Sequence, residues 1–126
     1  MAKKKCCSDG ELNLPDEVDE ALRSCGGLDV LRRALSSEDV RINEAVRHEA
    51  LSDPKRLMIL ESLQYCDLCP CIIRELTGLS DSKLSYHLKL LEEAGLVSWR
   101  QSKNWRIYAL TSSGRISLLG LRTSKR

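Results

Sequence analysis

Apolar residues recur with helical spacing through most of the chain and with a period of two near its end. Pro15 opens the first predicted helix, and two carboxylates follow it in the first turn. Val18, Ala21 and Leu22 form its apolar stripe, and the glycine pair at 26–27 ends it.

Further helices are predicted before any strand pattern begins. One apolar run covers 28–35, and another starts after the serines at 36–37 and continues to Leu51. Ser52-Asp53-Pro54, a cap followed by a first-turn proline, opens the next helix. Pro70 is predicted to open another, and Ser80 to cap a last one that ends at Gly95.

Beyond Gly95 the apolar period changes to two. The alternating residues are Val97, Trp99 and Gln101 before the loop 102–104, and Trp105, Ile107 and Ala109 after it. Aromatic and β-branched residues around a short polar loop predict a β-hairpin. The run 116–121 predicts at most a brief terminal helix. The fold class is therefore mainly α with a small β-hairpin, in the order of a winged helix-turn-helix.

The net charge of +2 conceals an asymmetry. Residues 1–52 hold 8 Lys and Arg against 11 Asp and Glu, whereas residues from Ser80 onward hold 9 against 3. A basic face on a small domain favours a polyanionic partner, although a solvated face that aids solubility has the same composition.

The predicted helix 81–94 has two distinct faces. Leu84, Leu88 and Leu91 lie together on one side of a helical wheel, and Ser82, Ser85, Tyr86 and Lys89 lie on the other. A helix that enters a major groove ~12 Å wide needs small hydrogen-bonding groups and long donors on its outer side. A merely solvated face would instead alternate Glu and Lys. Near the hairpin loop, Arg100, Lys103 and Arg106 are placed as phosphate clamps.

Four segments, HEALSDPKRLMILESL, LCPCIIREL, LSDSKLSYHLKLLEEAGLV and SWRQSKNWRIYAL, resemble the ArsR/SmtB-type family of arsenical-resistance repressors over roughly 48–110. The resemblance implies a homodimer that reads an inverted repeat in double-stranded DNA and is released by an inducer. It assigns base reading to Ser82, Ser85 and Tyr86. Asp81 departs from the neutral donor of many relatives, and it either serves the helix N-terminus or reads a cytosine amino group. The candidate DNA-contacting residues are Ser82, Lys83, Ser85, Tyr86, Lys89, Arg100, Lys103 and Arg106.

Six cysteines in a chain without an export signal favour metal binding or reversible redox chemistry over structural disulfides. Cys66, Cys69 and Cys71 form C-x2-C-x-C. Pro70 predicts Cys69 as a helix cap and Cys71 as the second helical residue, where backbone N–H groups and the helix dipole favour thiolate. Burial as ordinary core residues is the weaker alternative, because three cysteines fall so close together.

The resemblance makes Leu68-Cys69-Pro70-Cys71 the metal-binding element of the arsenic-, cadmium- and lead-sensing branches. Some relatives add arm cysteines across the dimer, and the candidate ligands here are Cys66, Cys69, Cys71, Cys6 and Cys7. The first three suit As(III) or Sb(III), and a fourth from the arm suits tetrahedral Cd(II), Pb(II) or Zn(II). Such an ion would act as inducer, and we expect no organic cofactor.

Other potential ligands are fewer. No His, Asp or Glu follows Thr111, so the family's other site, on the C-terminal helix, is absent from this sequence. We interpret His87 as structural and His48 as a weak ligand candidate. Cys25, at a predicted helix end, is interpreted as a packing residue, with a ligand role as the alternative.

Three hypotheses follow from these patterns. The first is a metal- or metalloid-responsive repressor, and the second is a winged-helix repressor that senses oxidation with the same cysteines. The third is a thiol-rich metal buffer or structural zinc protein without DNA binding. No nucleophile–base pair or phosphate loop is visible, so we do not expect an enzyme.

The length of 126 residues allows one domain with additions. We expect a flexible cysteine-containing arm at 1–13, a helical extension for dimerisation at 14–47, a DNA-binding and sensor domain at 48–115, and a tail or short helix at 116–126. No apolar run approaches the ~20 residues that span a bilayer. The chain is therefore expected in the cytoplasm, with no membrane partner.

Overall fold

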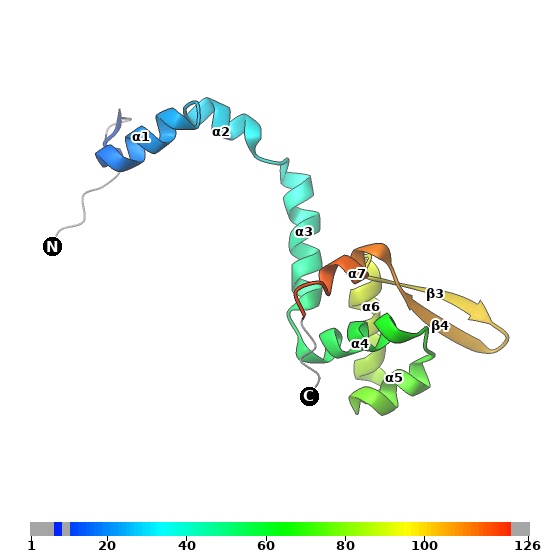
Figure 1. Cartoon of the computed structure of the whole chain (residues 1–126). Helices are drawn as coiled ribbons and strands as arrows, with labels where there is room; N and C mark the ends of the chain where they lie inside the picture. The colour runs from blue at the N-terminus through cyan, green and yellow to red at the C-terminus, as the bar shows by residue number, and fades with distance from the viewer. Residues whose placement is uncertain (1–6, 9–10, 122–126) are drawn as a thin grey trace. The chain divides into compact units, whose positions relative to one another are not determined.

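The computed structural model describes residues 7–8 and 11–121 of the chain. The chain divides into two compact units, with the boundary between Glu38 and Asp39. Figure 1 labels the helices of both units and colours the chain from blue at its N-terminus to red at its C-terminus. Each unit is described by itself below.

The first unit holds two very short strands and two helices. β1 (Cys7–Ser8) pairs antiparallel with β2 (Glu11–Leu12), and α1 (Asp16–Ser24) and α2 (Leu28–Ala34) follow. The sequence predicts both helices but not the strands, because two-residue strands are too short to show an alternating pattern. No residue of α1 or α2 is buried, and several of their large apolar side chains are exposed.

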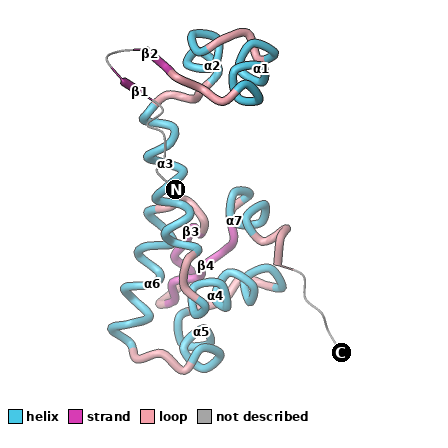
Figure 2. Tube along the Cα trace, turned by 90° about the vertical axis from the view of Figure 1, so that its left-hand side faces the viewer, coloured by secondary structure: helices cyan, strands magenta, loops and turns pink. Residues whose placement is uncertain are grey.

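The second unit contains the rest of the fold. Its elements are α3 (Glu38–Leu51), α4 (Pro54–Tyr65), α5 (Pro70–Thr77), α6 (Asp81–Glu93), β3 (Val97–Ser102), β4 (Trp105–Leu110) and α7 (Ser112–Ser117). The turn 78–80 joins α5 to α6, and the hairpin follows α6 (Figure 2). This order confirms the predicted winged helix-turn-helix. The domain boundary expected between residues 47 and 48 falls within α3, which is continuous there.

A single hydrophobic core holds the second unit together. Its fully buried large side chains come from α4, α5, α6 and the start of the hairpin: Ile59, Leu60, Ile73, Leu91 and Leu96. Leu84 and Leu88 join them from α6. The leucine face predicted for that helix is therefore confirmed as its buried side.

Local sequence determines where the helices begin and end. Asp53 Oδ1 accepts hydrogen bonds from the backbone N–H groups of Arg56 (3.1 Å) and Lys55 (2.8 Å), and these bonds hold the pKa of the Asp53 carboxyl below its ordinary value. Ser80 Oγ accepts a bond from the N–H of Lys83 at 3.3 Å and so caps α6. Gly78 ends α5 in the left-handed conformation, with φ at 71°.

The terminal helix differs from the prediction. α7 spans Ser112–Ser117 and not 116–121, because Thr111 caps it and accepts a hydrogen bond from the N–H of Gly114 at 3.0 Å. Capping by a polar side chain outweighs the short apolar run that suggested the later start. Within the described residues, no helix is long and apolar enough to cross a membrane.

Candidate nucleic-acid interface and thiol site

The outer face of α6 carries polar side chains at every position predicted to read DNA. Ser82, Lys83, Ser85, Tyr86 and Lys89 are all solvent-exposed. Tyr86 is the largest of them, with 59% of its surface exposed. The arrangement offers small hydroxyls beside longer donors along one side of the helix, while their contacts with DNA stay a prediction.

A buried arginine fixes α6 against α4. The Nη1 group of Arg56 donates to Nδ1 of His87 on α6 at 2.9 Å, and its Nε–H donates to the carbonyl oxygen of Ala50 at 2.8 Å. Because a guanidinium only donates, the accepting Nδ1 carries no proton. The sequence predicts a structural role for His87, but no role was predicted for Arg56. Arg56 precedes Leu60 by four residues and Leu63 by seven, and this helical spacing could have placed it on the core face of α4.

Two carboxylates next to the α6 face are paired within the protein. Asp81 Oδ1 lies 2.7 Å from Nη1 of Arg74 on α5, and this hydrogen bond and charge raise the pKa of the arginine. Glu92 Oε1 accepts a bond from the indole N–H of Trp99 at 3.0 Å. The Arg74 guanidinium offsets the charge of Asp81, which would otherwise repel phosphate, whereas the neutral indole only hydrogen-bonds to Glu92.

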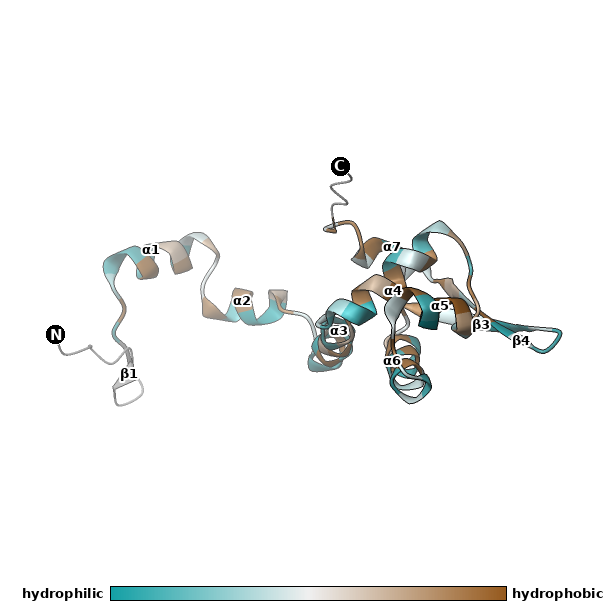
Figure 3. Ribbon diagram, turned by 90° about the horizontal axis from the view of Figure 1, so that it is seen from below, coloured by the Kyte–Doolittle hydropathy of each residue, from teal (hydrophilic) through white to brown (hydrophobic). Residues whose placement is uncertain are grey.

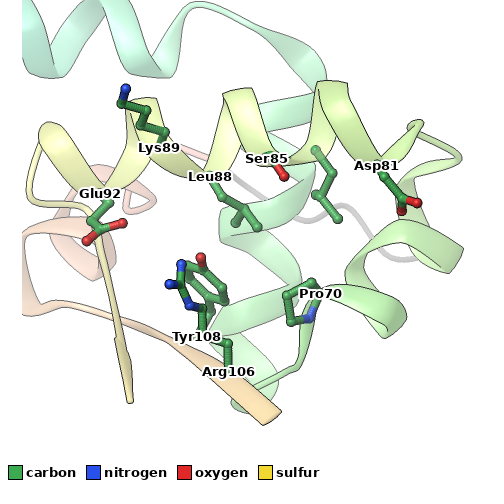
Figure 4. Close-up of a pocket in the computed structure, with 9 residues that line it drawn as sticks. Pro70, Asp81, Ser85, Leu88, Lys89, Glu92, Arg106 and Tyr108 are labelled. Carbon is green, nitrogen blue, oxygen red and sulfur yellow. The ribbon is translucent and has the colours of Figure 1, made fainter. Parts of the chain in front are cut away.

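A hollow of about 490 Å³ separates α6 from β4 (Figure 4). Leu84, Ser85 and Leu88 line it from α6, and Arg106 and Tyr108 line it from β4. In Figure 4 Leu88 points toward Tyr108, which is itself almost fully buried. The apolar side chains of Leu84 and Leu88 therefore line the hollow next to polar side chains, such as Ser85, that belong to the outer face of α6.

The β3–β4 hairpin, called the wing from here on, holds its arginines by side-chain contacts. The guanidinium carbon of Arg106 lies 3.9 Å from the ring centroid of Trp99, and Nη1 of Arg100 lies 2.9 Å from Oδ2 of Asp67. Lys103 occupies the turn with φ at 55° and is exposed. Figure 3 shows the free end of the wing as hydrophilic. All three predicted phosphate clamps are solvent-exposed, two of them preoriented by a neighbour.

Cys69 and Cys71 form a close pair, called the thiol site from here on, at the start of α5. Their Sγ atoms lie 3.5 Å apart and both residues are half-buried. Cys69 is the N-cap and Pro70 the first helical residue, as the sequence predicts. The backbone N–H of Ile72 and then the thiol of Cys71 lower the pKa of Cys69, whereas the hydrogen bond and charge of Cys69 and partial burial raise the pKa of Cys71.

Within the second unit, the remaining candidate cysteine, Cys66, does not join this pair to form a group of three ligands. Cys66 follows α4 and is exposed, and Cys25 follows α1 in the first unit and is also exposed. Cys7 lies in β1 and Cys6 lies outside the described residues. His48 Nε2 lies 3.4 Å from Glu44 on α3. Among residues 7–8 and 11–121, no three Cys, His, Asp or Glu side chains gather as a metal site.

The thiol site nevertheless fits part of a thiophilic coordination sphere. Two thiolates bound at ~2.3 Å to a tetrahedral ion have sulfur atoms ~3.8 Å apart, and a narrower pyramidal angle brings them closer. The observed separation of 3.5 Å lies close to that value. Cys69 and Cys71 can thus supply two ligands without rearrangement, and further ligands must come from elsewhere.

Comparison with known proteins agrees with this architecture. A family model described as "bacterial regulatory protein, arsR family" matches residues 53–98. A Halobacterium salinarum protein provisionally named arsenical resistance operon repressor ArsR is 34% identical over 123 residues, which cover 95% of this chain and 87% of that protein.

Solved structures give the same result. NolR from Sinorhizobium fredii superposes with a TM-score of 0.61 at 34% identity, over 69% of this chain and 89% of that one. The homodimeric winged helix-turn-helix DNA-binding domain of a possible ArsR-family transcriptional regulator from Mycobacterium bovis gives a TM-score of 0.61 at 25% identity, over 70% of this chain and 84% of that one.

Proposed function

Because this chain belongs to the ArsR family of bacterial regulatory proteins, we propose that it is a homodimeric repressor released from operator DNA when a thiophilic ion binds its cysteines. The family consists of winged helix-turn-helix transcriptional regulators, so the chain is not an enzyme. The observation that carries the proposal is the pair of thiols 3.5 Å apart at the start of α5. That helix packs directly on α6, the predicted DNA-reading helix.

DNA recognition is proposed for α6 and the wing together. The exposed polar side of α6 would enter the major groove, with Ser82, Ser85 and Tyr86 at the base edges. Lys83 and Lys89 on the helix, and Arg100, Lys103 and Arg106 on the wing, would contact phosphates. The pairing of Asp81 with Arg74 supports this assignment, since it offsets a carboxylate at the helix N-terminus.

Dimerisation is proposed for α1, α2 and α3. Neither α1 nor α2 buries a residue, and α3 buries only Ala50 among its described residues. Ile42 and Val46, one helical turn apart on α3, are 53% and 44% exposed. A second copy would cover such apolar side chains, and two copies present two α6 helices to half-sites ~34 Å apart.

Cys69 and Cys71 are the proposed core of the inducer site. A bound thiophilic ion would cross-link thiolates. Cys66 would be the third ligand for As(III) or Sb(III), and Cys66 together with Cys6 or Cys7 of the arm would complete a four-sulfur site for Cd(II), Pb(II) or Zn(II). Coordination requires thiolates, so Cys71 loses the proton that it shares with Cys69. Coordination there would change the hydrogen bonding at the start of α5, a helix that packs on α6.

Cys69→Ser combined with Cys71→Ser tests the proposal. The variant should bind duplex DNA from upstream of its own gene with wild-type affinity, since neither residue lies on the outer face of α6 or on the wing. Arsenite or Cd(II) should release the wild type but not the variant, as followed by fluorescence anisotropy. Cys25→Ser is the matched control and should be released normally. Normal release of the double variant would place the sensor elsewhere.

A second function, redox sensing, is favoured by the same sulfur pair. The thiolate of Cys69 would attack an oxidant such as peroxide to form a sulfenic acid, which condenses with Cys71 to a disulfide and water. Each disulfide consumes two thiols and one peroxide and yields two waters. Release of DNA by peroxide with loss of two thiols, and no response to Cd(II) or arsenite, would favour this function over ion sensing.

A further inference from the structure

The segment that precedes the thiol site pairs with the wing through an isolated antiparallel β-bridge. The N–H of Leu68 donates to the carbonyl oxygen of Tyr108 at 3.1 Å, and the N–H of Tyr108 donates to that of Leu68 at 2.8 Å. Residues 66–69, called the sensor loop here, thus contact β4 at Leu68, and their last residue caps α5. One peptide unit separates Cys69 from the backbone bridge to the wing.

An ion pair ties the same loop to the other wing strand. Asp67 Oδ2 accepts a hydrogen bond from Nη1 of Arg100 at 2.9 Å. Arg100 is paired with Ile107 in the hairpin register, so the contact reaches past β4 to β3. Leu68 and Asp67 together hold the loop to both strands of the wing.

The neighbouring residue of β3 holds the wing to α6. Trp99, next to Arg100, donates its indole N–H to Glu92 near the end of α6 at 3.0 Å. Tyr108, the backbone partner of Leu68, is also the register partner of Trp99. The wing therefore contacts the sensor loop at Arg100 and Tyr108 and the predicted DNA-reading helix at Trp99.

We infer that Asp67 and Arg100 are positioning residues that couple the thiol site to the angle of the wing. The inference rests on the proposed function and adds to it the route by which ion binding changes the DNA-contacting surface. An exposed ion pair contributes little to folding stability. Its removal should therefore leave a folded protein in which the loop keeps its backbone bridge to β4 but loses its contact with β3.

Asp67→Asn tests this route, with Glu75→Gln, an exposed carboxylate on α5, as the matched control. Operator affinity is measured with and without whichever of As(III) and Cd(II) releases the wild type. Ion binding should lower the operator affinity of the wild type and of Glu75→Gln by the usual allosteric factor of ~5–150. It should lower the operator affinity of Asp67→Asn by less than about 3-fold. Thiolate charge-transfer absorption should be the same in all three, and Asp67→Glu should restore release.

A second readout needs no DNA. In a Trp105→Phe background Trp99 is the only tryptophan, because the chain has two. Ion binding should change Trp99 emission when Asp67 is present and leave it unchanged in Asp67→Asn. If the Asp67→Asn variant lost as much operator affinity on ion binding as the wild type, and showed the same change in Trp99 emission, the inference would be wrong while the proposed function would stand. A wild type that binds the ion and stays on DNA would overturn the proposed function, and the inference with it.

Discussion

Two thiols one residue apart differ in acidity because of their positions in the first turn of α5. At Cys69, in the cap position, the backbone N–H of Ile72 and then the thiol of Cys71 lower the pKa. Cys71, inside the helix, faces the charge of Cys69 and has a raised pKa. Cys69 therefore ionises at a lower pH than Cys71.

Alkylation rates should show this difference directly. In reduced, ion-free protein near pH 7, iodoacetamide should label Cys69 faster than Cys71, because a lowered pKa gives the larger thiolate fraction. The ratio should fall only when the pH rises above the raised pKa of Cys71, since both groups are then ionised. Peptide mass spectrometry measures the two rates, and equal labelling at pH 7 would contradict the assignment.

At the scale of elements, close backbone packing joins α7 to the start of the wing. A Cβ at Gly114 would overlap the carbonyl oxygen of Leu96 and lie 2.7 Å from Cδ1 of Leu110. Leu96 also accepts a hydrogen bond from the N–H of Thr111 at 3.1 Å, which is the cap of α7. The fold requires glycine at position 114 for this approach.

Gly114→Ala should therefore lower the free energy of unfolding by about 1–3 kcal/mol, the usual cost of overpacking a filled site. Gly120→Ala is the matched control, because a Cβ there meets nothing within 4 Å. Urea denaturation followed by circular dichroism compares the two. A stability loss no larger in Gly114→Ala than in Gly120→Ala would show that the contact relaxes freely.

Elements with strong local signals could be predicted from the sequence, and contacts between distant residues could not. The prolines at 54 and 70 predicted where α4 and α5 begin and therefore the cap position of Cys69. The helical wheel of α6 predicted its buried leucines. The pairs Arg56–His87 and Asp67–Arg100 link residues 31 and 33 positions apart. No local pattern encodes such pairs, because they depend on how helices and wing pack.

At the scale of the whole molecule, the proposed repressor requires a second copy of the chain. The second unit has its own core, whereas the described residues of α1 and α2 are all at least partly exposed. Apolar side chains left on α1, α2 and α3 provide the surface proposed for the partner. Their burial would add hydrophobic stabilisation that one chain lacks.

Ile42→Arg should disrupt that dimer. Ile42 is 53% exposed in the single chain, so the substitution leaves the fold intact but buries an unpaired charge between copies. We expect dimer affinity to fall by about 3 kcal/mol, more than a hundredfold. Sedimentation velocity measures the effect, with Gln64→Arg on the exposed side of α4 as control. An unchanged dimer would place the interface elsewhere.

The most direct test of ion-controlled DNA release follows both events in one titration. Wild-type dimer on fluorescent operator DNA is titrated with arsenite or Cd(II) while thiolate absorption and DNA anisotropy are recorded together. We expect the rise in thiolate absorption and the fall in DNA anisotropy to saturate at the same ion-to-protein ratio. In the Cys69→Ser, Cys71→Ser variant, adding the ion should cause neither change. Saturated thiolate absorption with DNA still bound, or release without thiolate absorption, would contradict the proposed function.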